Sequence, residues 1–333
     1  MIRPKFEYPP SHRAWSRRRW LAVVGAAFGL WLFYSLTASG LDYYGCYTWM
    51  VTLPEKLKTV VDTTWTLNPP WMVPFMAPFI MTPGRFGYIL FMAASLAAVV
   101  WACYVFGGRP ILTLLSAQMF WVLWWGQLEG WGALGLVLGW FAQAGGSWFW
   151  MFIALAVGSF KPQVGFAPVA MAWWWLGKQR WKALAAMAAL FAASLVIWGP
   201  WPVWYITGIT RFVGDGHAGT WNASLGWMAL PLYLPALLLP LNKEQRLIAL
   251  TATTLLVSPY MPYYSTILLL CFNIPVWAYV FAFIGYLPAE LGTGIAWNGI
   301  AFLPLTVLAW LYWPLLKSWW QRRRSETAAQ ATK

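Results

Sequence analysis

Asp42 is the residue of this chain best suited to proton chemistry. The sequence has only 9 Asp and Glu residues among 333, and Asp42 follows a long apolar run at 20–37. A carboxylate in such a place can take the proton of a hydroxyl group bound within hydrogen-bond reach. The structural alternatives are a solvated Asp in a loop and a cap for a helix at 43–51. We favour the catalytic interpretation because carboxylates with perturbed pKa values concentrate at functional sites.

The other acidic residues fall into three groups. Three of them lie among Lys and Arg, where we expect them only to balance charge: Glu7, Glu244 and Glu326. Three more fall in segments that we place on the same side of a membrane as Asp42: Glu55, Asp62 and Asp215. Glu129 and Glu290 lie in largely apolar surroundings.

Lys161 is the cation whose position most needs an explanation. It lies inside an apolar stretch just before Pro162, and an unpaired cation in a membrane costs about 2.5–3.5 kcal/mol on insertion scales. It could receive a phosphate group, pair with Glu129 across helices, or snorkel to the membrane interface. Arg211 is a second candidate for phosphate binding, and its alternative is an ordinary interfacial arginine.

The composition determines the class of protein. With 61% hydrophobic and 9% charged residues, the chain is unlike a soluble globular domain, in which about 25% of residues are charged. A helix needs about 20 residues to cross the hydrocarbon core, and its backbone must satisfy its own hydrogen bonds there. We therefore expect an all-α, polytopic transmembrane helical bundle of about 10–12 helices, some of them short or broken.

The net charge of +13 is concentrated at the two ends and in short connections. This distribution follows the positive-inside rule if both termini are cytoplasmic, so we do not expect a nucleic-acid partner. We expect an integral protein of the plasma or inner membrane, with a basic cytoplasmic segment at 1–19, a transmembrane domain at 20–317 and a basic cytoplasmic tail at 318–333. Three widely separated cysteines predict neither a disulfide framework nor a metal cluster: Cys46, Cys103 and Cys271.

Apolar segments recur along nearly the whole chain. Their approximate ranges are 20–38, 70–82, 86–105, 110–125, 130–143, 148–176, 183–199, 223–240, 247–259, 262–287 and 298–316. An even number of crossings requires that either 148–176 or 262–287 counts as two short helices. We expect a polar loop up to about 68 and a second long loop at about 200–222 to face the side of Asp42.

Several short motifs occur in order through about residues 20–270. They are Asp42-Tyr43-Tyr44; Asn68-Pro69-Pro70-Trp71 with Pro74 and Pro78; Gly126-Gln127; Lys161-Pro162-Gln163; Trp221-Asn222-Ala223-Ser224-Leu225; and Ser258-Pro259-Tyr260 with Tyr263-Tyr264. Together they resemble the integral-membrane glycosyltransferases of the GT-C superfamily, and they are most similar to the polyprenyl-phosphate-mannose-dependent mannosyltransferases. In that family an aromatic residue usually stands where this chain has Asn68.

The resemblance implies a reaction. A sugar, mannose in the most similar family, moves with inversion from a polyprenyl-phosphate donor to a lipid or glycan acceptor at the extracytoplasmic face. Asp42 would act as the general base, and Lys161 and Arg211 would bind the donor phosphate. Six residues would contact the substrates: Asn68, Gln127, Gln163, Asn222, Tyr260 and Tyr264. We expect neither a cofactor nor a metal, because Asp215 and His217 lack a cluster of further ligands.

Two functions of other classes compete with the enzyme. A transporter would also bury a few charges at broken helices, with Lys161 and Glu129 as its coupling pair, although its usual inverted repeats are not apparent in the sequence. A non-catalytic scaffold subunit would explain the 29 tryptophans and leave Asp42 without a role. We rank the enzyme first, the transporter second and the scaffold third.

Overall fold

The computed structural model describes residues 7–52, 68–214, 222, 224–284 and 301–331. Within these ranges every regular element is a helix, which confirms the all-α class, and an isolated β-bridge joins Gly107 and Phe272. The elements are α1 (Arg17–Thr37), η1 (Tyr43–Tyr47), α2 (Thr48–Thr52), η3 (Pro70–Met72), α4 (Val73–Ile80), α5 (Arg85–Phe106), α6 (Pro110–Leu114), α7 (Ala117–Trp125), α8 (Glu129–Gly145), α9 (Trp148–Gly158), α10 (Pro162–Trp174), η4 (Gly177–Gln179), α11 (Arg180–Trp198), α12 (Trp201–Gly214), η5 (Gly226–Leu232), α13 (Tyr233–Leu238), α14 (Lys243–Val257), η6 (Tyr263–Thr266), α15 (Ile267–Leu270), α16 (Ala278–Ile284) and α18 (Phe302–Ala331).

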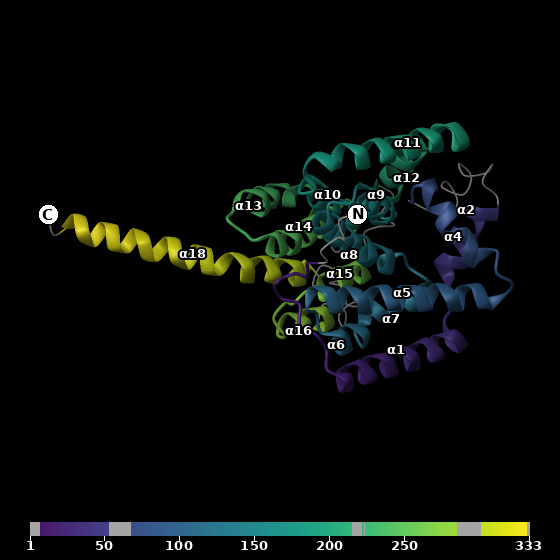
Figure 1. Ribbon diagram of the computed structural model, residues 1–333, viewed down its shortest axis with the longest axis horizontal. Coiled ribbons are helices and arrows are strands. Elements are labelled where there is room, and N and C mark those ends of the chain that lie inside the picture. Colours follow the sequence, from purple (N-terminus) through teal and green to yellow (C-terminus); the bar gives the residue numbers. More distant parts are fainter. Residues whose placement is uncertain (1–6, 53–67, 215–221, 223, 285–300, 332–333) are drawn as a thin grey trace.

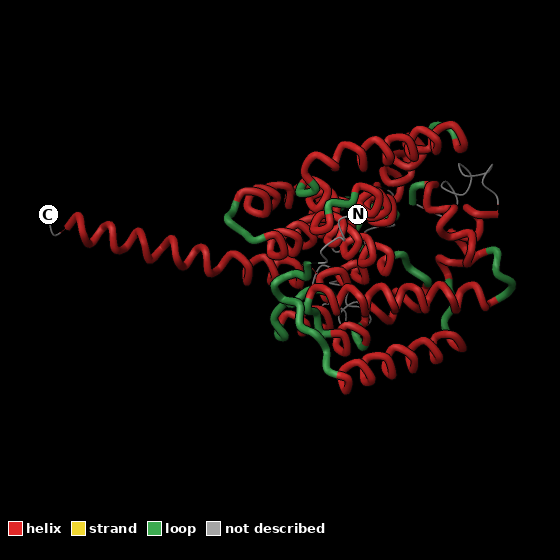
Figure 2. Tube along the Cα trace, viewed as in Figure 1, coloured by secondary structure: helices red, strands yellow, loops and turns green. Residues whose placement is uncertain are grey.

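Helix α8 is at the centre of the packing. It contacts α9, α5 and α10, and α10 also packs against α14. Glycine allows α8 and α9 to approach closely, because a Cβ atom on Gly135 would lie only 2.8 Å from the Cα atom of Gly158. The helices form one bundle, from which α18 extends away toward the C-terminus (Figures 1 and 2).

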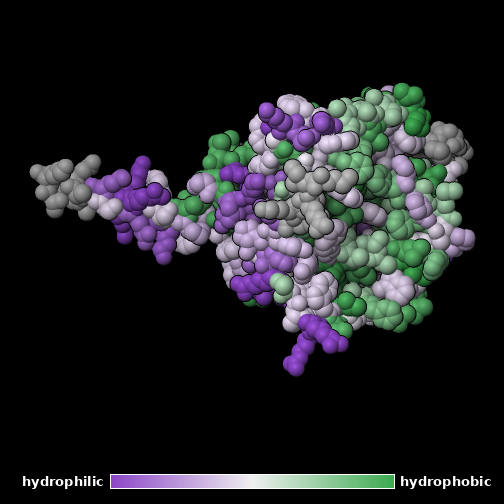
Figure 3. All heavy atoms as spheres, in the orientation of Figure 1, coloured by the Kyte–Doolittle hydropathy of each residue, from purple (hydrophilic) through white to green (hydrophobic). Residues whose placement is uncertain are grey.

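Three helical segments in the described part of the chain are long and apolar enough to cross a membrane. They are Arg17–Thr37, Arg85–Phe106 and Gly177–Trp198. On the face shown in Figure 3, hydrophilic residues gather on the side where α18 leaves the bundle, and hydrophobic residues dominate the opposite side. The chain therefore has membrane-helix character.

Several expected segments are divided in the structure. The segment 148–176 breaks into α9 and α10 at Lys161, because Pro162 cannot continue a helix but fits the first turn of a new one. The segment 110–125 breaks before Ser116, whose side chain caps α7 by accepting a hydrogen bond from the Met119 amide at 3.2 Å. The segment 262–287 also breaks, between α15 and α16.

Two expectations from the sequence were wrong. The range 200–222 was expected to be a loop, but α12 covers most of it, because Pro202 lies at its start and the following residues put an apolar face toward the bundle. Glu244 was expected only to balance charge, yet it is buried and accepts hydrogen bonds from both the amide and the hydroxyl of Ser11. The residues Glu55, Asp62, Asp215, His217, Trp221, Ala223 and Glu290 lie outside the described residues.

Candidate functional site

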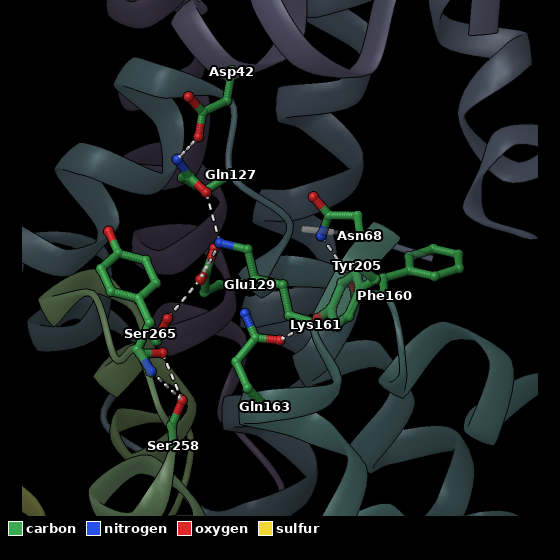
Figure 4. Close-up of polar contacts among 11 residues, drawn as sticks. Asp42, Asn68, Gln127, Glu129, Phe160, Lys161, Gln163, Tyr205, Ser258 and Ser265 are labelled. Atoms are coloured by element: carbon green, nitrogen blue, oxygen red, sulfur yellow. Dashed lines mark hydrogen bonds and ion pairs between the residues drawn. The ribbon is translucent and has the colours of Figure 1, made fainter. Parts of the chain in front are cut away.

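A chain of hydrogen bonds joins three charged residues of the bundle, Asp42, Lys161 and Glu129 (Figure 4). Gln127 donates to the Asp42 carboxylate through Nε2, and its Oε1 accepts from Lys161 Nζ at 2.7 Å. The same ammonium group lies 2.8 Å from Glu129 Oε1, which also accepts from the Ser265 hydroxyl at 2.7 Å. These hydrogen bonds bring together residues from four separate regions of the sequence.

Asp42 is positioned by its attachment to the end of α7. The Gly40 amide donates to the Trp124 carbonyl at 2.9 Å, and Arg85 Nη2 donates to the Ala38 carbonyl at 2.7 Å. These contacts fix the short segment between α1 and η1. The Asp42 side chain makes no capping hydrogen bond to the helix that follows, so the helix-cap interpretation was wrong.

Gly126 allows the turn that places Gln127 opposite Asp42. Its φ of +78° is a left-handed conformation that ends α7, and glycine adopts this conformation without strain. A Cβ atom at this position would lie 2.8 Å from side-chain atoms of both Tyr43 and Tyr88. The Gly126-Gln127 motif therefore combines a turn with a close contact to η1.

The surroundings of Asp42 make its carboxylate a stronger base than an ordinary Asp. Burial raises the pKa of Asp42 to about 6, and the nearby Glu129 carboxylate also raises it. The charge of Lys161 and the hydrogen bond from Gln127 lower the pKa of Asp42, but only in part. The residue is half-buried, so at neutral pH it is an ionised carboxylate that can still be reached.

Three phenol groups surround the charged residues. Burial raises the pKa of Tyr47, Tyr260 and Tyr264, and the nearby carboxylates of Asp42 and Glu129 raise it further. The Tyr260 and Tyr264 side chains are hydrogen-bonded to each other, and Lys161 Nζ lies 4.9 Å from the centre of the Tyr264 ring. The phenols therefore stay neutral and can donate hydrogen bonds to an anion or a sugar.

Lys161 and Glu129 form the only ion pair within the described residues. The Lys161 side chain is 13% exposed and the Glu129 side chain is fully buried, so Lys161 does not snorkel to an interface. Two of the three N–H groups of Lys161 donate to Gln127 and Glu129, which leaves one for another acceptor. Glu129 Oε2 is buried and has no hydrogen-bond partner in the described part of the chain.

Asn68 and Trp71 hold the chain just before Lys161. Asn68 Nδ2 donates to the Phe160 carbonyl at 2.6 Å, and Trp71 Nε1 donates to the Ser159 hydroxyl at 3.2 Å. Since Asn68 is buried and its amide is used in this way, its position in the motif has a clear structural reason. The motif fixes the turn from which the Lys161 side chain extends.

The remaining predicted residues lie around this centre with different roles. Gln163 Oε1 accepts a hydrogen bond from the Tyr205 hydroxyl at 3.4 Å, which links α10 to α12. Asn222 donates to the Pro259 carbonyl at 3.1 Å, accepts from the Met261 amide at 2.9 Å, and lines a cavity of about 510 Å³. Arg211 is exposed in the last turn of α12 and does not belong to the hydrogen-bond chain.

The structure adds residues that the sequence did not indicate as parts of the site. Ser265 orients Glu129, Arg85 fixes the segment before Asp42, and Tyr47 lies close to both carboxylates. Serine and tyrosine are common in apolar segments, so the sequence around Ser265 and Tyr47 does not mark them as parts of a site. Arg85 is not distinguished by its position either, because α1 and α11 also begin with basic residues.

Comparisons of the chain with protein families, with curated proteins and with solved structures found no match. In the residues that the structure describes, the fold is thus all-helical, with three candidate membrane-spanning helices and a half-buried cluster of charged residues and phenols.

Proposed function

We propose that this protein is a membrane glycosyltransferase that moves a sugar, mannose in our proposal, from a polyprenyl-phosphate donor to a hydroxyl group of a lipid or glycan acceptor. One observation carries the proposal. The side chain of Gln127 connects a half-buried carboxylate, Asp42, to a half-buried ammonium group, Lys161. A glycosyl transfer needs both groups. The base takes the proton that leaves the acceptor, and the cation stabilises the phosphate that leaves the donor.

Asp42 is the proposed general base. An alcohol is too weakly acidic to ionise at neutral pH, so its proton must move to a base as the oxygen attacks the anomeric carbon. As the new carbon–oxygen bond forms, the bond from the anomeric carbon to the phosphate oxygen breaks, and polyprenyl phosphate leaves with the electron pair. Such a single displacement inverts the configuration of the anomeric carbon. The raised pKa of Asp42 favours the proton transfer.

The departing phosphate gains negative charge, which the site can stabilise. The third N–H group of Lys161 and the neutral phenols of Tyr260 and Tyr264 are suitable donors. Glu129 Oε2 suits a sugar hydroxyl as a donor, because a buried acceptor without a partner costs about 1–3 kcal/mol. Arg211, Asn68, Gln163 and Asn222 remain proposed contacts to more distant parts of the substrates.

The proposal includes a location. A polytopic GT-C-like bundle with both termini in the cytoplasm would place Asp42 near the extracytoplasmic surface, because α1 leads from the basic N-terminal segment to Asp42. A polyprenyl chain would then remain in the bilayer while its sugar phosphate enters the site.

A proton-coupled transporter is the second candidate, and the ion pair is the observation that favours it. Lys161 and Glu129 form a buried pair connected to a second carboxylate, and such groups mark proton relays in transporters. The two functions differ in their products. Only the enzyme produces free polyprenyl phosphate and a glycosylated acceptor.

Membranes that contain this chain should transfer radiolabelled mannose from polyprenyl-phosphate-mannose to a lipid or glycan fraction. Membranes without the chain are the control, and a panel of other polyprenyl-phosphate sugars covers a different sugar. If none of these donors loses its sugar, and the same protein in vesicles changes the internal pH when a solute is added, the transporter replaces the enzyme.

A further inference from the structure

A second polar cavity lies at the place where the N-terminal segment meets the junction of α5 and α6. It has a volume of about 260 Å³. Three arginines are among its lining residues, Arg13, Arg19 and Arg109, together with Ser11 and Asn273. None of these residues takes part in the hydrogen-bond chain around Asp42.

Polar contacts hold the N-terminal segment that lines the cavity. The Ser11 hydroxyl oxygen lies 2.9 Å from the Phe106 carbonyl oxygen, and His12 Nδ1 lies 2.9 Å from the Tyr104 carbonyl oxygen. Gly107 has a φ of +70°, and a Cβ atom there would lie 2.5 Å from the Ser11 carbonyl oxygen. The N-terminal segment is therefore held against the end of α5. Arg19 Nη2 also donates to the Gly108 carbonyl at 3.4 Å.

The cavity also carries positive charge that the protein does not neutralise. Within the described residues the single ion pair is that of Lys161 and Glu129, so none of the three guanidinium groups forms one. The carboxylate next to this region, Glu244, accepts its hydrogen bonds from Ser11. The planar guanidinium group matches the geometry of a phosphate, so a phosphate is a suitable occupant.

An apolar groove of about 630 Å³ begins beside the cavity and follows α1 and α5. Trp20 lines the start of the groove, and its ring centre lies 4.7 Å from that of Trp15, which lines the cavity. The groove continues along α1 to Trp31. At 1.5 Å per residue this distance is roughly 17 Å, which is about half of a hydrocarbon core of about 30 Å. The groove thus has the length of one leaflet.

We infer that the cavity and the groove together bind one anionic phospholipid. Its phosphodiester group lies among Arg13, Arg19 and Arg109, and its acyl chains lie along the groove between α1 and α5. The inference commits to a lipid because free phosphate would use the charged cavity but not the groove. It does not depend on the proposed sugar transfer.

The experiment uses the full-length protein in a neutral detergent and dioleoylphosphatidylglycerol as the probe, with binding measured by native mass spectrometry. The double variant Arg13→Gln/Arg109→Gln should bind the lipid more weakly by on the order of tenfold or more, since charge-assisted hydrogen bonds are lost. The variant Ala97→Trp fills the groove without changing the charge and should also weaken binding. Both arginines are exposed, so their substitution is compatible with folding.

The matched control is Arg323→Gln/Arg324→Gln, which removes the same charge from the exposed part of α18 and should leave binding unchanged. An equal loss of binding in this control would show general electrostatic attraction and overturn the inference. Normal binding by Ala97→Trp would remove the groove from the site and overturn it as well. Displacement of the lipid by a moderate excess of inorganic phosphate would identify a free-phosphate site instead.

Discussion

Asp42 and Lys161 carry opposite charges, but they do not form an ion pair, because Gln127 lies between them. A direct ion pair would lower the pKa of Asp42 and weaken it as a base. Glu129 takes the ion pair instead, so Asp42 keeps a pKa of about 6. Lys161 still lowers the pKa of Asp42, but burial raises that pKa by more.

The first prediction concerns the pH dependence of turnover. Asp42 acts only in its ionised form, so the rate should rise with pH through a midpoint near 6 and then level off. An ordinary Asp, with a pKa of about 3.9, would give a midpoint about two units lower. The measurement is the initial rate of sugar transfer between pH 4.5 and 8. A rate that is already constant above pH 5 would contradict the role of burial at Asp42.

The second prediction separates the contribution of Gln127. Its hydrogen bond stabilises the charged carboxylate and lowers the pKa of Asp42. Gln127→Leu removes that bond, so the midpoint of the pH profile should move above 6. Gln143→Leu is a suitable control, because Gln143 bonds to the exposed Lys243 instead. An unchanged midpoint in the Gln127 variant would show that Gln127 does not act on Asp42.

The third prediction concerns stability. Lys161→Met leaves the buried Glu129 without its partner, which should lower the free energy of unfolding by about 3–5 kcal/mol. The double variant Lys161→Met/Glu129→Gln removes the uncompensated charge and should recover much of that loss. Denaturant titration in detergent measures both values, and Lys243→Met, at an exposed lysine, should change little. Equal stability of the single and double variants would argue against the pair.

At the scale of the elements, the turn at Gly126 connects the fold to the site. Gly126 and Gly146 both follow the end of a helix with positive φ, at +78° and +68°. A Cβ atom would meet Tyr43 and Tyr88 at Gly126 but nothing within 4 Å at Gly146. A side chain at either position would strain the backbone, because both glycines have a left-handed conformation. Only at Gly126 would it also clash with other side chains.

The fourth prediction uses this pair. Gly146→Ala should cost about 1–2 kcal/mol, the strain of a left-handed residue, and should leave sugar transfer intact. Gly126→Ala should cost more and should lower turnover, because the clash moves Gln127 away from Asp42. Unfolding free energies and transfer rates of the two variants give the comparison. Equal behaviour of both variants would mean that contact with η1 does not matter.

The elements also show how far the sequence could predict the structure. Apolar runs located most helices, and Pro162 indicated the break before α10. The helix α12 was missed because Arg211, with Asp215, His217 and Asn222 farther along the chain, made the whole range resemble a polar loop. The sequence raised the pairing of Lys161 with Glu129 as one possibility, because both charges lie in apolar runs. The contacts through Gln127 and Ser265 depend on packing, and no spacing along the chain reveals them.

At the scale of the whole molecule, Asp42 must lie on the side that faces outward if the donor is extracytoplasmic. The fifth prediction tests this orientation with single cysteines in a background without the three natural ones. Met81→Cys, at an exposed position beyond α4, should react with an impermeant maleimide added to intact cells. A cysteine at 180 or 323 should react only after the membrane is permeabilised. The reverse pattern would place the site on the cytoplasmic side and exclude an extracytoplasmic donor.

The central claim is that Asp42 removes the proton from the acceptor, and the variant Asp42→Asn tests it most directly. Asparagine keeps the shape of the side chain but is not a base. Sugar transfer from the polyprenyl-phosphate donor should therefore fall by about 10²–10⁴-fold, while donor binding, measured separately, stays close to that of the wild type. An Asp42→Asn protein that transfers sugar at the wild-type rate would contradict the account.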